Sequence, residues 1–345
     1  MAEHKNIRLP AEWEPQYGVQ LTWPHEHSDW RDHLAEVEAC FVEIAKEISF
    51  HERVLIVCPD TRHVAALLQK AEARVDQIAL THAPSNDTWT RDHGPITVFE
   101  NDTPLLLDFA FNGWGLRFPA NLDNELSRSL HRKGVLKGAD LRTLGLVLEG
   151  GAIESDGQGS ILTTKYCLLS PNRNPHLDQA QLETQLCEFL GAQRILWLSH
   201  GFLQGDDTDS HVDTLARFCD ACTIAYVGCD DPDDPHYEEL GAMEAELKAL
   251  TAPDGESYSL VRLPMPSAKY DSELNRLPAT YANFLIINSA VLLPTYNDPL
   301  DETALELLTQ CFPGRTLIGI DCSSLILQHG SLHCVTMQFP KGVRF

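Results

Sequence analysis

The chain has 345 residues, of which 43% are hydrophobic and 22% are charged, and its formal charge is −24 at pH 7. This composition is that of a globular protein, and the excess of acidic residues argues against nucleic acid as a partner, because nucleic-acid binding needs a basic surface. The longest apolar runs have the length of strands. They are shorter than the roughly 18 residues that a membrane-spanning helix needs, so we expect no membrane contact.

The polar start at 1–6 lacks the apolar core of a secretory signal, so we expect a cytoplasmic protein. Apolar residues with a period of 3.6 then predict helices over 32–50, 62–74, 121–131, 178–190, 237–250 and 302–311. Apolar, β-branched runs predict strands over 53–58, 95–99, 160–163, 194–198, 222–227, 259–263, 284–293 and 315–320. The tail from 324 to 338 is predicted as two strands that meet at a turn over 329–331. No low-complexity linker divides the chain, so we expect one α/β domain over 1–345.

The ten cysteines are spaced irregularly, and Cys219 and Cys222 form the only C-x-x-C pair. A zinc site would usually need a second such pair or histidines at ligand spacing, so we expect buried free thiols there.

Cys334 stands out near the end of the chain, where the small or polar residues at 330, 331 and 336 leave room for a ligand. A buried structural cysteine is the alternative. On the predicted strand, His333 points away from Cys334, and His329 fails by the same odd spacing. A base for this thiol must therefore come from elsewhere in the chain.

His211 and Asp213 are two residues apart, so on an extended strand both would enter one site. A solvated acidic loop is one alternative. A metal site is another, because the segment 206–213 holds four aspartates and one histidine, which suit Mg²⁺ or Mn²⁺.

Three further regions carry polar or aromatic candidates in loops. Asp92 follows Trp89, and an indole beside a carboxylate is a platform for a cation, although a turn capped by the aspartate would look the same. Glu149 precedes two glycines, where backbone can approach closely, and its alternative is an exposed loop residue. Trp114 lies between two glycines and fits either a pocket wall or the core.

A weak rhythm connects these residues: Asp92, Glu149, His211, Asn283 and Cys334 follow one another at intervals of 57, 62, 72 and 51 residues. Each lies where a strand meets a turn. Five units of about 69 residues would fill the chain and predict a closed, propeller-like ring with one polar residue per unit at its axis. A doubly wound open sheet is the alternative, although no nucleotide-binding glycine motif supports it.

At these residues the chain resembles the agmatine deiminase and bacterial peptidylarginine deiminase family of guanidine-modifying enzymes. The matching segments occur in the family's order and span nearly the whole chain: 13–15, 22–24, 89–95, 112–115, 149–151, 167–175, 205–218, 281–284 and 330–336. The resemblance implies a five-bladed α/β propeller, or pentein, with pseudo-fivefold repeats around a central active site and no metal or organic cofactor.

The resemblance also implies residue roles. Cys334 would be the nucleophile and His211 the general acid/base, with Glu149 orienting or polarising His211. Asp92 and Asp213 would grip a planar guanidinium through paired N–H···O bonds and present its carbon to sulfur. A thiolate favoured by protonated His211 and by the bound cation would attack that carbon and form an amidino-thioether, which water then hydrolyses.

Asn283 lies in the family's Tyr-x-Asn-Phe segment and would be a secondary contact, with Trp89 and Trp114 lining the substrate site. The implied substrate is a small cationic guanidino compound. The first hypothesis is deimination of agmatine to N-carbamoylputrescine plus ammonia in putrescine biosynthesis, and the alternative is deimination of peptidyl-arginine. A homodimer is left open as the assembly.

Two other classes of protein remain: a metal-dependent hydrolase built on 206–213, and a non-catalytic propeller that binds partners through its acidic surface. The chain differs from agmatine deiminases at 329–332 and at 165–166, which concerns recognition of the far end of the substrate.

Overall fold

The computed structural model describes residues 6–345. The first five residues lie outside the described part of the chain. They include most of the polar segment 1–6, from which we inferred the lack of a secretory signal, and the start of the expected 1–345 domain. Within 6–345, no helix is both long enough and apolar enough to cross a membrane.

One unit recurs five times in this part of the chain: an antiparallel strand pair, a helix, and a third strand parallel to the second. The first three units are β19 (Thr336–Pro340), β2 (Gln16–Thr22), α1 (Leu34–His51) and β3 (Arg53–Cys58); β5 (Ile96–Glu100), β6 (Thr103–Ala110), α5 (Asp123–Arg132) and β7 (Asp140–Val147); and β8 (Ile153–Ser155), β9 (Ser160–Thr164), α7 (Gln179–Leu190) and β10 (Arg194–Leu198). The last two are β11 (Ala216–Asp220), β12 (Thr223–Gly228), α8 (Tyr237–Ala249) and β13 (Ser259–Pro264); and β16 (Leu285–Ile286), β17 (Ala290–Thr295), α9 (Asp301–Cys311) and β18 (Thr316–Asp321).

The first unit joins the two ends of the chain. The C-terminal strand β19 pairs antiparallel with the N-terminal strand β2, with Thr336 opposite Leu21 and Phe339 opposite Gly18. The same sheet is extended by α2 (Thr61–Lys70) and β4 (Ile78–His82). The turn that holds Cys334 is thereby fixed to the first sheet.

The remaining elements are short. They are β1 (Ile7–Arg8), which pairs with β5, the hairpin of β14 (Lys269–Tyr270) and β15 (Arg276–Leu277), the helices α3 (Thr90–His93), α4 (Gly113–Leu116) and α6 (Lys165–Leu168), and the 3₁₀ turns 31–33, 75–77, 150–152, 212–214 and 325–328.

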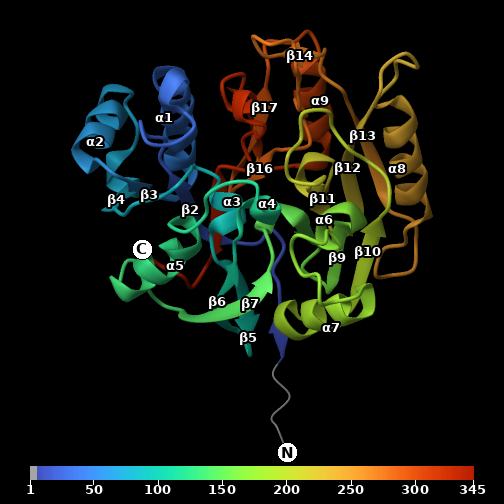
Figure 1. Cartoon of the computed structure of the whole chain (residues 1–345), viewed down its shortest axis with the longest axis horizontal. Helices are drawn as coiled ribbons and strands as arrows, with labels where there is room; N and C mark the ends of the chain where they lie inside the picture. The colour runs from blue at the N-terminus through green and yellow to red at the C-terminus, as the bar shows by residue number, and fades with distance from the viewer. Residues whose placement is uncertain (1–5) are drawn as a thin grey trace, which may run out of the picture.

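The long helices α1, α9, α8, α7 and α5 lie at the periphery of the view in Figure 1, and α3 and α4 lie near its centre. Each long helix buries one apolar face, as α1 does with Phe41, Ile44 and Ile48, because a helix on a sheet removes that stripe from water. The central strands are buried on both faces, which explains why β3 is an unbroken apolar run.

The predicted helices agree with the observed ones to within a few residues, and the largest error is the end of α2, at Lys70 rather than 74. The segment 284–293 was predicted as one strand, but it holds two, β16 and β17, joined by a turn.

The tail is a clearer correction. Residues Leu325–Gln328 form a 3₁₀ turn, and Cys334 lies in a turn before β19 rather than inside a strand. The backbone N–H of Thr336 donates to the carbonyl of His333 and closes that turn. A short apolar run such as 324–327 suits a buried helical turn as well as a strand, so periodicity alone could not separate them.

Candidate active site

The five residues of the weak rhythm each stand just before the first strand of one unit. Asp92 precedes β5, Glu149 precedes β8, His211 precedes β11, Asn283 precedes β16 and Cys334 precedes β19. The loops that carry them converge, so residues separated by up to 242 positions lie in one polar cluster.

Cys334 is 6% exposed, and its sulfur donates to Oδ1 of Asn283 at 3.4 Å. The same oxygen accepts the backbone N–H of His333 at 2.9 Å, so Asn283 fixes the turn and the thiol together. Burial, followed by the charges of Asp213 and Asp92, raises the pKa of the thiol well above its usual value. Burial and these two carboxylates therefore favour the protonated thiol in the substrate-free site.

Asp92 is held by two neutral donors. Its Oδ1 accepts the backbone N–H of Gly151 at 3.0 Å, and its Oδ2 accepts the indole N–H of Trp114 at 2.9 Å. The imidazole Nδ1 of His211 lies 3.6 Å from Oδ1. Burial raises the pKa of this carboxyl group, and protonated His211 opposes that rise.

Trp114 reaches Asp92 from a strained loop. Gly113, Trp114, Gly115 and Leu116 all have positive φ values, of 68°, 53°, 81° and 69°. Two glycines accept this conformation easily, but Trp and Leu do not. Arg117 secures the loop by donating to the backbone carbonyl of Asp207 and to the carboxylate of Asp209. Strain of this kind is typical of functional loops.

His211 and Asp213 enter the site from a 3₁₀ turn, Val212–Thr214, and not from the extended strand that the spacing predicted. Both side chains nevertheless lie beside Gly151. A Cβ atom on Gly151 would lie 2.7 Å from His211 Nδ1 and 3.1 Å from Asp213 Oδ2. Burial works against the charged imidazole, but Asp92, then Cys167 and Glu149, raise the pKa of His211 well above its usual value.

Asp213 has one oxygen occupied and one free. Its Oδ2 accepts from Nδ1 of His333 at 2.7 Å, whereas the buried Oδ1 has no hydrogen-bond partner among the described residues. Burial opposes its ionisation, but the bond from His333 prevails and lowers the pKa of Asp213. The residue therefore offers an ionised, unpaired oxygen.

Glu149 is fully buried, not an exposed loop residue. Both of its oxygens accept from Nε of Arg173, at 3.0 and 2.9 Å, and Arg173 continues to Asp209 at 2.6 Å. Glu149 lies near His211, as expected for a residue that polarises the imidazole.

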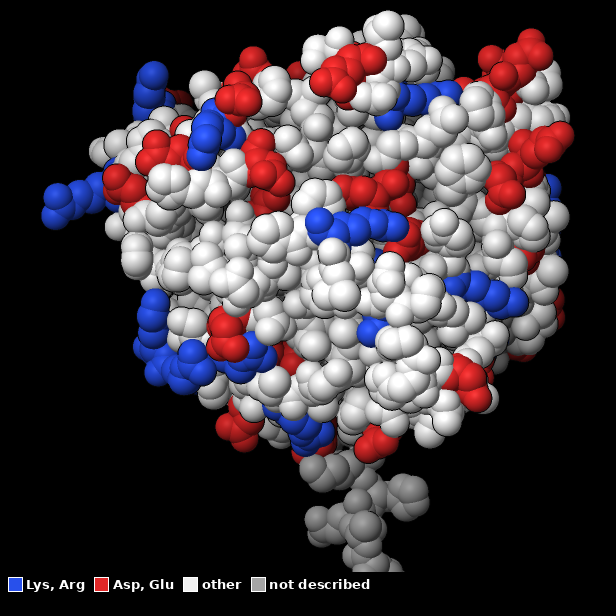
Figure 2. All heavy atoms as spheres, viewed as in Figure 1, with Lys and Arg blue, Asp and Glu red and all other residues white. Residues whose placement is uncertain are grey.

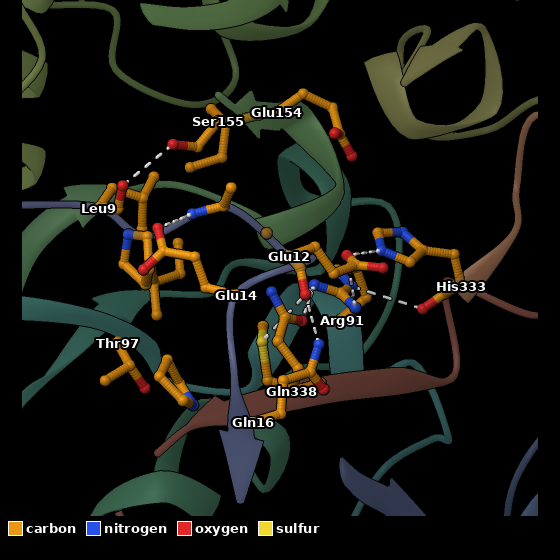
Figure 3. A pocket seen from close by; sticks show the side chains of 17 residues that line it. Leu9, Glu12, Glu14, Gln16, Arg91, Thr97, Glu154, Ser155, His333 and Gln338 are labelled. Carbon is orange, nitrogen blue, oxygen red and sulfur yellow. Dashed lines mark hydrogen bonds and ion pairs between the residues drawn. The ribbon is translucent and has the colours of Figure 1, made fainter. Parts of the chain in front are cut away.

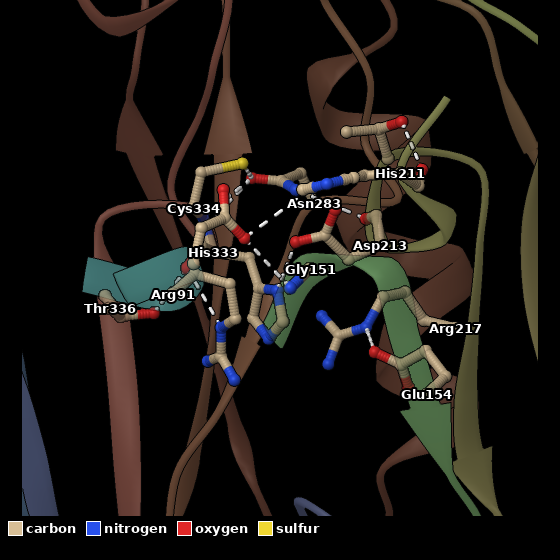
Figure 4. A network of polar contacts seen from close by, with 12 residues as sticks. Arg91, Gly151, Glu154, His211, Asp213, Arg217, Asn283, His333, Cys334 and Thr336 are labelled. Atoms are coloured by element: carbon tan, nitrogen blue, oxygen red, sulfur yellow. Dashed lines mark hydrogen bonds and ion pairs between the residues drawn. The ribbon is translucent and has the colours of Figure 1, made fainter. Parts of the chain in front are cut away.

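Sequence reasoning missed a charge network behind the site. His333 Nε2 lies 2.7 Å from Glu12 Oε2, which also accepts from Arg217 at 2.8 Å, and Arg217 pairs with Glu154. Figure 4 shows the sulfur of Cys334 and the ring of His211 near Asn283, with the His333 ring pointing toward Arg217 and Glu154. A signal for Arg217 existed, because an arginine inside an apolar strand needs a buried anion. Glu12 carried no comparable signal.

A cavity of about 640 Å³ adjoins this network on its other side (Figure 3). Glu12, Arg91 and His333 line it, but Cys334 does not. His333 and Cys334 thus line different cavities, as expected. The turn directs the two side chains apart, and not the alternation of a strand as predicted.

Cys334 lines a second cavity. Among residues 6–345, no lysine or arginine lines it; its wall includes four carboxylates, two tryptophans and the sulfur, namely Asp29, Asp87, Asp92, Asp207, Trp89, Trp114 and Cys334. Burial and nearby acidic groups raise the pKa of Asp87 and of Asp207 to about 6, because these carboxylates lack a full counter-charge. Acidic side chains also gather near the position of α4 on the face in Figure 2. The cavity is complementary to a cation.

The segment 206–213 does not provide the metal site considered above. Asp206 accepts from the backbone of Thr208 and Ser210, Asp209 pairs with Arg117 and Arg173, and Asp213 pairs with His333. Within 6–345, no group of three donors that could hold an ion includes two of these aspartates.

A buried thiol, an imidazole and two carboxylates lie beside an acid-lined cavity on repeated ββαβ units, which is the arrangement of a deiminase, an enzyme that hydrolyses a C–N bond of an amidine. A model of the Porphyromonas-type peptidyl-arginine deiminase family matches residues 8–340, and the chain belongs to that family.

Named relatives agree with this membership. The agmatine deiminase of Pseudomonas syringae pv. tomato is 34% identical over 97% of this chain and 95% of its own length. A C. jejuni agmatine deiminase with substrate bound is 38% identical, with a TM-score of 0.92 over 100% of this chain and 99% of its own. A crystal structure from Porphyromonas gingivalis, provisionally called an arginine deiminase, is 53% identical, with a TM-score of 0.94 over 98% and 100% of the two chains.

The lack of a side chain at Gly151 allows His211, Asp92 and Asp213 to approach one another closely. We therefore predict that Gly151→Ala lowers kcat/KM on a guanidino substrate by about 100-fold, which is the cost of displacing reacting groups by about 1 Å. The added Cβ would also lie 2.9 Å from Oδ1 of Asp92, and the backbone of Gly151 is not left-handed, so folding should survive. Gly145→Ala is the matched control, because nothing lies within 4 Å of its Cβ position. Steady-state kinetics that retain more than a tenth of wild-type kcat/KM would contradict the close approach.

The raised pKa of Cys334 predicts slow alkylation of the substrate-free enzyme at neutral pH. Only the thiolate reacts, so the rate of modification by iodoacetamide should still be rising at pH 9. Mass spectrometry of the peptide that contains Cys334 measures this rate from pH 6 to 10. A plateau below pH 8 would show a resting thiolate instead.

Proposed function

We propose that this protein hydrolyses agmatine to N-carbamoylputrescine and ammonia through a covalent intermediate on Cys334. The observation that carries the proposal is the cavity that joins this thiol to four carboxylates without a lysine or arginine in its wall. Agmatine is a dication, with a guanidinium at one end and an ammonium at the other. Free arginine would bring a carboxylate toward Asp29, Asp87 and Asp207, and like charges in a partly buried cavity repel.

The guanidinium end is placed by Asp92 and Asp213. The unpartnered Oδ1 of Asp213 and the remaining lone pairs of Asp92 accept guanidinium N–H groups, which fixes the plane of the cation before sulfur. Its positive charge offsets the two carboxylates that raise the pKa of Cys334. Substrate binding itself thus promotes loss of the thiol proton.

The chemistry then uses sulfur and one imidazole. The thiol proton passes to solvent, sulfur attacks the guanidinium carbon, protonated His211 donates its proton to the departing nitrogen, and ammonia leaves while the amidino group stays bound to sulfur. Neutral His211 next takes a proton from water, whose oxygen attacks the amidino carbon, and the carbon–sulfur bond breaks to return the thiol and release the ureido product. Asp92, followed by Cys167 and Glu149, raises the pKa of His211 and favours its protonated form between turnovers, and Asn283 holds the sulfur in place.

His333 acts indirectly in this scheme. It touches neither the sulfur nor the cavity of Cys334, but its bond to Asp213 keeps that carboxylate ionised and oriented. Glu12 on its other nitrogen fixes the ring. His333 is therefore a positioning residue.

We further propose that the five units are the blades of one closed propeller, forming a single catalytic domain around this cavity. The support is that each unit has the same strand order and carries one of the five polar residues before its first strand. The homodimer and the cytoplasmic location stay predictions.

Peptidyl-arginine is the second candidate, and the description of the matching family favours it. A neutral peptide would bring no positive charge toward Asp87 and Asp207, whose pKa values are raised by burial and nearby acidic groups. The chain also departs from agmatine deiminases at His329, which lines the same cavity.

Ammonia release with agmatine, free arginine and an arginine-containing peptide, assayed side by side, tests the function. We expect agmatine to have the highest kcat/KM, by at least about tenfold. Cys334→Ala should abolish release, whereas Cys222→Ala, which changes an exposed thiol, should not. Preference for the peptide would replace the proposed substrate, and turnover in Cys334→Ala would reject the mechanism.

Each guanidinium-binding carboxylate should matter separately. We predict that Asp92→Asn and Asp213→Asn each lower kcat/KM for agmatine by more than about tenfold, or roughly 1.4 kcal/mol, because the amide removes a charged acceptor without changing the side chain's shape. Asp178→Asn, at the start of α7, is the control because its side chain caps a helix away from the cavity. Smaller losses in both site variants would contradict a clamping role.

A further inference from the structure

Cys167 is a buried thiol that the proposed reaction does not use. Its sulfur, one ring nitrogen of His211 and a carboxylate oxygen of Glu149 all lie within 4.8 Å of one another. None of the three side chains is more than 1% exposed. A sulfur, a nitrogen and an oxygen atom thus lie close together. Of the three residues, only Cys167 has no role in the proposed reaction.

Two of these donors have unused capacity. Nε2 of His211 is buried without a nitrogen or oxygen hydrogen-bond partner among the described residues, and the imidazole interacts instead with the thiol of Cys167, which helps to raise the pKa of His211. Glu149 receives one N–H group, from Nε of Arg173, shared between its two oxygens, which leaves further lone pairs free. Buried polar atoms without partners are uncommon and indicate a missing ion or molecule.

The surroundings are those of a metal ligand set. The other ring nitrogen of His211, Nδ1, faces the carboxylate of Asp92 at 3.6 Å, and Arg173 orients Glu149. A carboxylate behind a histidine and a hydrogen bond to a ligating carboxylate are the usual supports of zinc ligands. Asp92, which faces His211, also lines the cavity of Cys334, so this cavity lies on the His211 side of the proposed site.

We propose that Glu149, Cys167 and His211 bind a zinc-class divalent cation, and that bound metal inhibits the enzyme by occupying His211. Zinc accepts this mixture of sulfur, nitrogen and oxygen, whereas Mg²⁺ and Ca²⁺ prefer oxygen alone. Tetrahedral zinc would hold these donors about 3.3–3.6 Å apart, a contraction of about 1 Å. Binding releases the protons of Cys167 and of protonated His211 and leaves one coordination position open.

The second buried group of donors, Glu12, Glu154 and His333, carries no such proposal. Two arginines face these carboxylates, because Arg217 pairs with both and Arg91 lies 3.8 Å from Glu12. In the first group one arginine, Arg173, pairs with the single carboxylate of Glu149.

Binding is tested without activity in Cys334→Ala, which removes the only thiol in the wall of the catalytic cavity. Titration with Co²⁺, followed by the ultraviolet thiolate-to-metal absorption, should show one tight equivalent. Adding Cys167→Ala should weaken binding by at least about tenfold and remove the band, whereas adding Cys222→Ala should change neither. No thiolate band in Cys334→Ala, or a band that survives Cys167→Ala, would overturn the site. If the double variant does not fold, loss of the band in Cys334→Ala/Cys222→Ala would overturn it equally, and its persistence there together with one Zn–S contact by X-ray absorption would support it.

The inhibition rests on the function proposed above and is measured separately, in enzyme with Cys334 intact. Zn²⁺ should reduce ammonia release reversibly, with EDTA restoring it, and Cys167→Ala should raise the half-inhibitory concentration by at least about tenfold relative to Cys222→Ala. An unchanged half-inhibitory concentration would overturn the inhibitory role. An enzyme inactive on every guanidino compound that still shows the cobalt band would reject the function and keep the site.

Discussion

The pairing of β19 with β2 is the constraint on which the site depends. It fastens the last strand of the chain to one of the first, and the turn before β19 carries Cys334. The backbone N–H of Arg91 donates to the carbonyl of Cys334, so the second unit is joined to the same turn. Because the thiol comes from one end of the chain and its partners from loops throughout it, the site forms only when all five units have assembled.

The charged side chains that this assembly buries compensate one another. Glu12, Glu154 and Asp213 face Arg217, Arg91 and His333, and all six side chains are buried. Removing one member would leave an uncompensated charge, which costs far more than the pair contributes. The network therefore ties catalytic geometry to folding, because the same His333 that pairs with Glu12 also orders Asp213.

Much of this could be predicted from the sequence, because each unit repeats a local pattern. The helices follow from their 3.6-residue period, and the spacing of Asp92, Glu149, His211, Asn283 and Cys334 predicted one polar residue per unit. The predicted local conformations of His211 and Cys334 were wrong, because both residues lie in turns and turns have no periodic sequence pattern. The pairing of Arg217 with Glu12 was missed, because it joins positions 205 residues apart and depends only on tertiary structure.

The acidic wall of the catalytic cavity has a consequence for release. In the proposed reaction the guanidinium becomes a neutral ureido group, so the ligand leaves with one positive charge fewer than it brought. The carboxylates that attract the incoming dication hold the outgoing monocation less strongly. Turnover thus weakens the electrostatic attraction between the ligand and the cavity, which favours release of the product.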